Sequence, residues 1–266
     1  MEYLKFVLYG IIQGLTEFIP VSSTAHLKIV SHLFGIEEPG SSLSAIIQMG
    51  SVFAIFWYFK KDLLKLKISN SKRIIKAFLL NKLLKSIFVG TLPFICLGLI
   101  IKLFFNYFFE TTLRSNISIG IISLFMALYM YFADISKNKF VNLKNHNYKN
   151  SFLIGLSQAL AIVPGVSRSG ITISTALISG WERNDATKYS FLLGIPAISL
   201  AAIGEFVFSF NKFSSINILS IVICLFSTFI FSLLAIDFLI KYLPTRGMKL
   251  FIYYRMIFGI LILMNL

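Results

Sequence analysis

The chain is short of charge, and above all of acidic side chains. Only 14% of its 266 residues are charged, with 11 Asp and Glu against 25 Lys and Arg. Soluble domains carry about 25% charged residues, so this chain has too little charge for an ordinary soluble enzyme. Hydrophobic residues make up 57% of it, and 28 residues are Phe. These values predict an all-α polytopic membrane protein without a sizeable soluble domain.

Cysteine is nearly absent as well. Cys96 and Cys224 each lie inside a separate apolar run, which argues against a disulfide framework or a cysteine-rich metal site. We therefore expect both to be small packed side chains. The N-terminal run has an acidic Glu2 and no small-residue cleavage site, so it is not expected to be a cleavable signal.

Basic residues gather in three connections between apolar segments. Such clustering in alternate loops is typical of cytoplasmic loops, and attraction to anionic membrane lipids accompanies it. We predict a multi-pass protein with its large basic loops in the cytoplasm, both termini outside, and no nucleic-acid partner. The basic residues of these connections are Lys60, Lys61, Lys65, Lys67, Lys72, Arg73, Lys76, Lys82 and Lys85, then Lys137, Lys139, Lys144 and Lys149, then Lys241, Arg246 and Lys249.

The apolar segments predict one integral membrane domain, residues 1–266, made of two similar halves. Each half begins with two short helices broken near a proline, too short to span a bilayer that needs about 20 apolar residues. Such a pair is typical of a re-entrant hairpin. An amphipathic surface helix is expected at Ser71–Leu84. The predicted hairpin helices are Tyr3–Ile19, Ser22–Leu33, Phe152–Val163 and Ser169–Ser179, and the predicted spans are Leu43–Phe59, Ser86–Phe109, Ile117–Phe132, Ala186–Phe208, Ile216–Ile240 and Met248–Leu266.

The two halves repeat one another in sequence. Repeat one covers about 1–133, a cytoplasmic connection about 134–150, and repeat two about 151–266. Three spans per half is an odd number, so the two halves are predicted to be inverted, with a site near the midplane where they meet. The matching residues, at an offset of 145, are Gly10, Gln13, Leu15 and Ser22 with Gly155, Gln158, Leu160 and Ser167.

The first hairpin carries a carboxylate in an apolar setting. Gln13 and Glu17 are four residues apart and share a helix face. Their oxygens could hold a hard cation, Mg²⁺ or Ca²⁺, together with waters and substrate oxygens. The alternative is that Glu17 only bonds neighbouring backbone, but an ionisable group at membrane depth usually marks a functional site.

Hydroxyl groups follow directly after Pro20. Ser22 is a candidate N-cap, and a helix N-terminus that carries Ser22 and Thr24 could bind an anion such as phosphate. Ser23 and His26 are three residues apart and can meet, as a nucleophile with its base, or with the histidine as acid to the leaving group. A serine that only caps a helix is the more common meaning of such a pattern.

The second hairpin contributes a cation. Gly165 and Gly170 allow close backbone approach to a ligand, and Arg168 is a fork-shaped donor suited to phosphate, flanked by Ser167 and Ser169. The alternative for Arg168 is to snorkel or to bridge helices. The following assignments concern residues outside the two hairpins: Arg255 snorkels or joins the site, Asp237 and Lys241 form a structural pair, and His32 and His146 are ordinary interfacial or loop residues.

An anionic headgroup bound near the midplane of a membrane implies a lipid phosphate or diphosphate. Gln13–His26, Gln-Gly-Leu-Thr-Glu-Phe-Ile-Pro-Val-Ser-Ser-Thr-Ala-His, and Pro164–Gly170, Pro-Gly-Val-Ser-Arg-Ser-Gly, closely resemble the two signature motifs of the undecaprenyl-diphosphate phosphatase family of the bacitracin-resistance type. Phe191–Pro196 and the pair Tyr254-Arg255 also resemble family features. The resemblance extends over essentially the full chain.

This resemblance implies an enzyme of the bacterial plasma membrane that hydrolyses undecaprenyl diphosphate to undecaprenyl phosphate and phosphate. The reaction recycles the lipid carrier for cell-wall synthesis and confers bacitracin resistance. The resemblance assigns catalysis to Glu17, Ser23, His26 and Arg168, with Gln13 where the family has Glu or Gln. It further implies a divalent cation and an inverted-repeat fold, and a homodimer is one assembly that it allows.

The sequence departs from the family pattern at two positions. Ala25 stands where glycine usually precedes the histidine, and Ser44 stands where an acidic residue is common. Neither removes a catalytic group. A transporter or flippase of polyprenyl phosphate lipids is the alternative function, because inverted repeats with broken helices are common in transporters. Two points stay undecided: the nucleophile, which is Ser23, His26 or a water activated by Glu17, and the leaflet to which the site opens.

Overall fold

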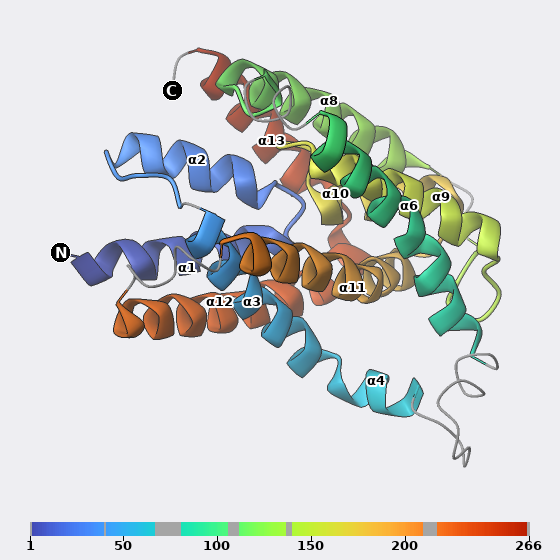
Figure 1. Ribbon diagram of the computed structural model, residues 1–266. Coiled ribbons are helices and arrows are strands. Elements are labelled where there is room, and N and C mark those ends of the chain that lie inside the picture. The colour runs from blue at the N-terminus through green and yellow to red at the C-terminus, as the bar shows by residue number, and fades with distance from the viewer. Residues whose placement is uncertain are drawn as a thin grey trace.

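The computed structural model describes residues 2–39, 41–66, 81–105, 112–136, 140–209 and 217–264. Within these residues the chain is helical apart from turns, loops and one isolated bridge between Val141 and Trp181. Figure 1 shows the helices, which are α1 Glu2–Phe18, α2 Ser23–Leu33, α3 Ser41–Tyr58, α4 Lys60–Leu66, α6 Lys82–Phe104, α8 Asn116–Ile135, α9 Tyr148–Ala159, α10 Arg168–Ile178, α11 Arg183–Ser209, α12 Ile218–Arg246 and α13 Lys249–Leu263.

These helices confirm the predicted all-helical fold in the part of the chain that the structure describes and agree with a polytopic membrane protein. Within the described residues, four helices are long and apolar enough to cross a membrane, namely α6, α8, α11 and α12. The predicted spans at α3 and α13 form shorter helices, of 18 and 15 residues. The amphipathic helix expected at Ser71–Leu84 falls mainly on 67–80, outside the described residues.

Both predicted breaks are present. The chain leaves helical geometry between α1 and α2 at Pro20, and between α9 and α10 at Pro164, where a short 3₁₀ turn, Leu160–Ile162, precedes the break. Proline lacks an N–H group and cannot continue a helix. Each break is followed by a helix of 11 residues, so the two motifs lie at equivalent points of two similar hairpins.

Helices from the two halves of the chain are interleaved. α1 packs along α12, and α8 packs along α13 (Figure 1). α3 contacts α11 and α12, α6 contacts α9, and α10 contacts α8. Since each of these pairs joins an element before residue 136 to one after residue 147, neither half forms its main contacts within itself.

Glycines allow two of these helix pairs to pack unusually closely. A Cβ atom built on Gly14 of α1 would lie 2.8 Å from the carbonyl oxygen of Thr228 in α12, and one built on Gly155 of α9 would lie 2.1 Å from the carbonyl oxygen of Gly90 in α6. Small residues at a crossing let membrane helices approach backbone to backbone. The hairpin helices α1 and α9 are therefore fixed in place by long helices of the opposite half.

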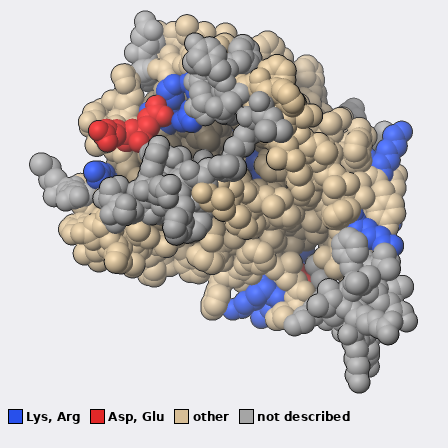
Figure 2. All heavy atoms as spheres, viewed as in Figure 1, with Lys and Arg blue, Asp and Glu red and all other residues tan. Residues whose placement is uncertain are grey.

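On the visible face, charged side chains are sparse among the residues that the structure describes. In Figure 2, acidic side chains gather at the upper left, beside basic ones, and most of the visible face is neither basic nor acidic. Arg114 and Glu38 form an exposed ion pair of 3.3 Å. The predicted pair of Asp237 and Lys241 is confirmed, at 2.6 Å.

Two predictions for single residues are corrected by packing. His146 is not an ordinary loop residue, because it is buried and its Nε2 lies 2.7 Å from the hydroxyl of Ser86 in α6. Cys224 is packed as expected, but Cys96 is exposed on α6. His32 is exposed at the end of α2, as expected.

Candidate active site

A carboxylate in the first hairpin is bonded to a serine across the break. Glu17 lies at the end of α1 and Ser23 at the start of α2, and the Ser23 hydroxyl donates to Glu17 Oε2 at 2.9 Å. Gln13, one turn earlier on α1, donates its amide N–H to the same oxygen at 3.0 Å. The expected shared face of Gln13 and Glu17 is thus confirmed, and the turn at Pro20 brings Ser23 onto that face.

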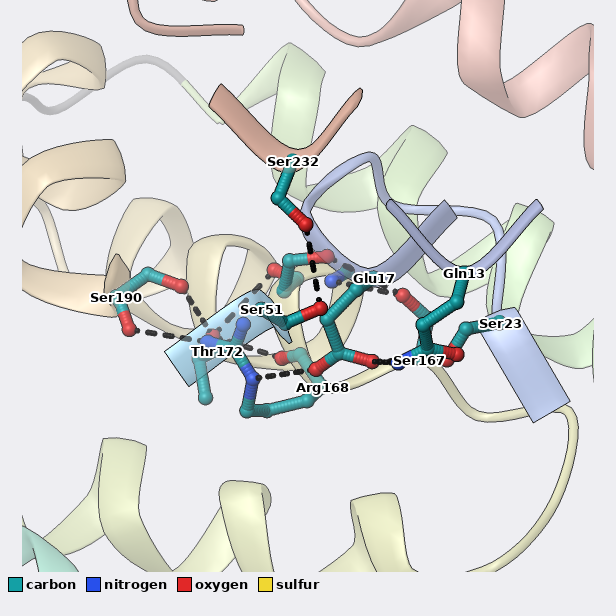
Figure 3. A network of polar contacts seen from close by, with 11 residues as sticks. Gln13, Glu17, Ser23, Ser51, Ser167, Arg168, Thr172, Ser190 and Ser232 are labelled. Atoms are coloured by element: carbon teal, nitrogen blue, oxygen red, sulfur yellow. Dashed lines mark hydrogen bonds and ion pairs between the residues drawn. The ribbon is translucent and has the colours of Figure 1, made fainter. Parts of the chain in front are cut away.

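Arg168 faces this carboxylate from the second hairpin. Its Nε lies 3.7 Å from Glu17 Oε1, and the two side chains are only 9% and 13% exposed. Figure 3 shows the guanidinium pointing toward Glu17, with Ser190 of α11 on its other side. Nη1 donates to the carbonyl oxygen of Ser190 at 3.3 Å. The Nε and Nη2 atoms are buried and make no hydrogen bond to the described residues. Nε faces the Glu17 carboxylate, so Nη2 is the nitrogen left to bond an anion.

The guanidinium is held by residues that surround its plane. It lies 5.8 Å from the ring centroid of Phe18, which packs edge-on against Phe191. Gly194 lies in α11, and a Cβ atom built on it would be 2.2 Å from Arg168 Nη1. Only glycine at position 194 leaves room for the arginine in this position.

The helices after the two breaks begin with the same unusual backbone. Ser22 and Ser167 have φ of 78° and 70°, and they are the only non-glycine residues with positive φ in the described part of the chain. Such backbone is strained for residues with a side chain, and strain of this kind clusters at functional sites. The Ser22 hydroxyl accepts a hydrogen bond from the N–H of Gly165 at 3.2 Å, which joins the two breaks directly.

The remaining hydroxyls and glycines occupy different settings. Ser167 and Ser169 are buried and their hydroxyls lie 3.3 Å apart, whereas Thr24 is exposed and contacts Ser22. A Cβ atom built on Gly170 would lie against Pro20, and one built on Gly165 would lie against α8. These two glycines therefore allow contact within the protein.

Arg255 joins the site rather than snorkelling to the membrane surface. It is completely buried in α13. Its guanidinium donates to the carbonyl oxygens of Pro20, at 3.3 Å, and of Gly165, and thus binds the backbone at both breaks. Its Nε reaches the carbonyl oxygen of Ser123 in α8 at 3.5 Å. Arg255 thus fixes the two hairpins relative to each other.

His26 does not contact Ser23 in the way that their spacing allowed. Its Nδ1 lies 2.7 Å from the carbonyl oxygen of Ser22, and its Nε2 lies 2.6 Å from the hydroxyl of Tyr254 in α13. Both ring nitrogens are therefore engaged, while the hydroxyl of Ser23 is bonded to Glu17 instead. The candidate base next to Ser23 is the carboxylate.

Several residues that shape the site were not assigned to it from the motifs. Ser190 and Thr172 share a hydrogen bond of 2.6 Å beside Arg168, and Gly194 and Tyr254 entered only as features of a family resemblance. The sequence does not indicate which partner a short polar residue inside a helix will bond.

A cavity of about 350 Å³ lies between α8 and α13, apart from this site. It is lined by Leu124, Ala127, Leu128, Tyr131, Lys249, Ile252, Tyr253 and Met256. None of these belongs to the polar cluster.

Glu17 is the carboxylate of this polar cluster that a hard cation shared with a substrate could use. Within the described residues no three His, Cys, Asp or Glu side chains group together. Mg²⁺ is often held by one or two carboxylates together with substrate phosphate oxygens and water, rather than by an all-protein cage. Glu17 supplies one such carboxylate, whereas Gln13 turns its amide N–H toward that carboxylate.

A carboxylate that is bonded to a serine and paired with a buried arginine, inside an apolar helical protein, is the arrangement expected of a membrane enzyme that acts on an anionic group. The chain belongs to the family described as "Bacitracin resistance protein BacA", whose model matches residues 6–261. It is 62% identical over 266 residues to an "Undecaprenyl-diphosphatase" of Prochlorococcus marinus (strain MIT 9515), covering 100% of both chains. It is 43% identical over 270 residues to an "Undecaprenyl-diphosphatase" of Trichodesmium erythraeum (strain IMS101), covering 100% of this chain and 86% of that protein.

Proposed function

We propose that this chain hydrolyses undecaprenyl diphosphate to undecaprenyl phosphate and phosphate at the cluster of Glu17, Ser23 and Arg168. The relatives named above carry that activity in their names. The observation that carries the proposal is the Arg168 guanidinium, buried with two nitrogens that make no hydrogen bond to the described residues, opposite a carboxylate bonded to a serine. A diphosphate supplies the oxygens that such a guanidinium binds.

Arg168 is proposed to bind the diphosphate and to stabilise charge on the transferred phosphoryl group. Fixed donors in a site that excludes water are effective in phosphoryl transfer, where positioning and charge stabilisation dominate. Ser22, Thr24, Ser167 and Ser169 are proposed to complete the binding of the headgroup, while Gly165 and Gly170 keep the backbone of the second break close to them. The N-termini of α2 and α10 lie beside them, and free N–H groups there favour an anion.

Ser23 is proposed as the nucleophile and Glu17 as its base. As Ser23 Oγ forms a bond to the terminal phosphorus, its proton passes to Glu17 Oε2, which already accepts it at 2.9 Å. The bond from phosphorus to the bridging oxygen breaks, and undecaprenyl phosphate leaves. Glu17 gives this proton to the departing undecaprenyl phosphate. A water then passes a proton to Glu17 and attacks the phosphorus, the bond from phosphorus to Ser23 Oγ breaks, and Glu17 returns the proton to Ser23 as phosphate is released. In the alternative, Glu17 activates a water for direct attack, and Ser23 only orients the carboxylate.

Glu17 and Gln13 are the residues that would hold a divalent cation, Mg²⁺ or Ca²⁺. When bound, the cation would supply positive charge that neutralises the diphosphate oxygens. Within the chain, the hydrogen bond from Gln13 to Glu17 orients the carboxylate toward Ser23. Removal of divalent cations with a chelator is therefore expected to lower activity, and added Mg²⁺ to restore it.

We further propose that the two halves are inverted repeats within a bacterial plasma-membrane protein, with both termini outside. The helix pairs support this, because the contact of α1 with α12 has a counterpart in that of α9 with α6, and the contact of α3 with α12 in that of α11 with α6. Exchange of the two halves thus reproduces these two pairs of contacts. Tagging each terminus and testing its accessibility from outside intact cells would check the orientation, and cross-linking would check for a homodimer.

Phosphate release from undecaprenyl diphosphate, by purified protein in detergent with Mg²⁺, tests the proposed function. Ser23→Ala, Glu17→Gln and Arg168→Lys should each lower kcat about 10²-fold or more, the usual cost of removing such a group. Ser136→Ala, outside the polar cluster, should behave as wild type. Radiolabelled phosphate trapped on wild type but not on Ser23→Ala would identify the nucleophile. Undiminished release by Arg168→Lys and Glu17→Gln would contradict the proposed site.

Transport of polyprenyl phosphate lipids is the second candidate, since paired broken hairpins are frequent in transporters. Liposomes with substrate confined to one leaflet separate the two functions. A hydrolase that does not move lipid releases phosphate only from the leaflet its site faces. Movement of the lipid across the bilayer without phosphate release would favour transport instead.

A further inference from the structure

The His26 ring is fixed by two helices at once. Its Nδ1 is bonded to the Ser22 carbonyl oxygen within α2, and its Nε2 to the Tyr254 hydroxyl of α13. The ring lies flat against Phe258, with 4.2 Å between centroids and 5° between planes. The imidazole can therefore neither rotate nor shift without loss of a contact to α13.

The hydrogen bonds define which nitrogen carries the proton. A carbonyl oxygen only accepts, so His26 Nδ1 donates to Ser22 and bears a hydrogen. In the neutral ring Nε2 then has a lone pair, and the Tyr254 hydroxyl donates to it. Because the hydrogen bond at one nitrogen sets the tautomer at the other, Tyr254 holds His26 in the form that binds the Ser22 carbonyl.

In the second hairpin, an ordinary serine cap stands where the first hairpin has the bond from His26 to the Ser22 carbonyl oxygen. There, the Ser167 hydroxyl accepts from the N–H of Gly170 at 3.3 Å and caps α10 in the ordinary way. The Ser22 hydroxyl makes no such cap bond to α2 and accepts from Gly165 instead. The position equivalent to His26, at the offset of 145, is Ile171. The His26 side chain, rather than the Ser22 hydroxyl, therefore fixes the first turn of α2, where the Ser22 backbone is strained.

We infer that Tyr254 is a positioning residue for the reaction at Ser23, an inference that rests on the proposed function. The Tyr254 hydroxyl fixes the tautomer of His26, His26 fixes the Ser22 carbonyl, and that peptide sets the direction of the adjacent Ser23 hydroxyl toward Glu17. The Tyr254 hydroxyl bonds the buried His26, although 43% of the tyrosine is exposed. The last helix thereby supplies part of the active-site geometry of the first hairpin.

Tyr254→Phe tests this inference, because it removes the hydroxyl and keeps the ring that packs beside His26. The matched control is Tyr253→Phe, its neighbour, which is 64% exposed and lines the separate cavity. We expect Tyr254→Phe to lower kcat for undecaprenyl diphosphate about tenfold or more, with KM little changed, since small misplacements of reacting groups are costly. Tyr253→Phe should keep the wild-type kcat.

A second measurement reports on His26 itself. The chain has only 3 histidines, so ¹⁵N-histidine labelling and NMR in detergent resolve the tautomer of each, with His26→Gln to assign the signal. Wild type and Tyr253→Phe should show a single tautomer protonated at Nδ1, and Tyr254→Phe a mixture. An unchanged kcat in Tyr254→Phe, or a reduced kcat with the tautomer intact, would overturn the inference. If wild type released no phosphate, the proposed function would fail, and the tautomer comparison would still decide whether Tyr254 controls His26.

Discussion

Gly194 contributes no side chain, and the Arg168 guanidinium occupies the space where one would lie. A Cβ atom at Gly194 would stand 2.2 Å from Nη1 and 2.7 Å from Cζ. Gly194→Ala should therefore displace the guanidinium from Glu17. We expect kcat/KM for phosphate release to fall about 10²-fold, as for other small misplacements in active sites.

Gly204→Ala is the matched control, because it lies on the same helix and a Cβ there meets nothing within 4 Å. Both substitutions raise helix propensity by a similar amount. Full activity of Gly204→Ala beside a disabled Gly194→Ala would assign the effect to Arg168. Equal activity of the two variants would show that the guanidinium tolerates displacement.

Arg255 binds carbonyl oxygens from three segments, at Pro20, Ser123 and Gly165. Arg255→Lys keeps the charge, but one ammonium group cannot replace a planar fork of donors. The buried carbonyls left without a partner should cost about 1–3 kcal/mol each. We expect a clearly lower thermal unfolding temperature in detergent together with lower activity. The exposed Arg246, at the end of α12, offers Arg246→Lys as a control that should change neither.

At the scale of elements, the hairpin helices depend on how closely they pack. In the contact of α9 with α6, a Cβ on Gly155 would lie 2.1 to 2.6 Å from three backbone atoms of Gly90. Backbone cannot move aside as a flexible side chain can, so Gly155→Ala should cost at least about 1–3 kcal/mol through overpacking.

Gly98→Ala, in the partner helix α6, is the control for this effect. A Cβ at Gly98 would have its nearest contact at 3.6 Å, an ordinary packing distance. Thermal unfolding of both variants in the same detergent gives the comparison. Equal unfolding temperatures for Gly155→Ala and Gly98→Ala would mean that α9 can shift away from α6 at little cost.

The elements themselves could be predicted from the sequence more fully than their contacts. The apolar runs predict the helices, and Pro20 and Pro164 predict both breaks, because these features depend on residues close together in the sequence. The i,i+4 spacing likewise placed Gln13 beside Glu17. The targets of Tyr254 and Arg255 depend on which helices pack together, and that pairing has no periodic signal. Spacing alone suggested a bond between Ser23 and His26, whereas α13 draws the imidazole away from Ser23.

For the whole molecule, the interleaving of the halves makes the connection between them part of the packed structure. His146, in this connection, bonds Ser86 of α6 in the first half. It also packs 5.3 Å from the ring of Trp181 and 6.0 Å from that of Tyr189 in the second half. The Tyr189 hydroxyl in turn donates to the Ser86 carbonyl oxygen at 3.0 Å. A single buried imidazole therefore ties the two halves together on the side of the connection.

Burial lowers the pKa of His146 from its ordinary value of 6.5, and nearby Lys82 lowers it further. Between the unfolded and folded pKa values the unfolded chain binds more protons, so protonation favours unfolding. The stabilisation is complete above pH 6.5 and is lost as the pH falls from 6.5 through the lower folded pKa. We expect the thermal unfolding temperature in detergent to fall between pH 7.5 and 5.5 by more in wild type than in His146→Gln. His32→Gln, at an exposed site, should keep the wild-type dependence, and an identical pH dependence in all three proteins would show that His146 does not link protonation to stability.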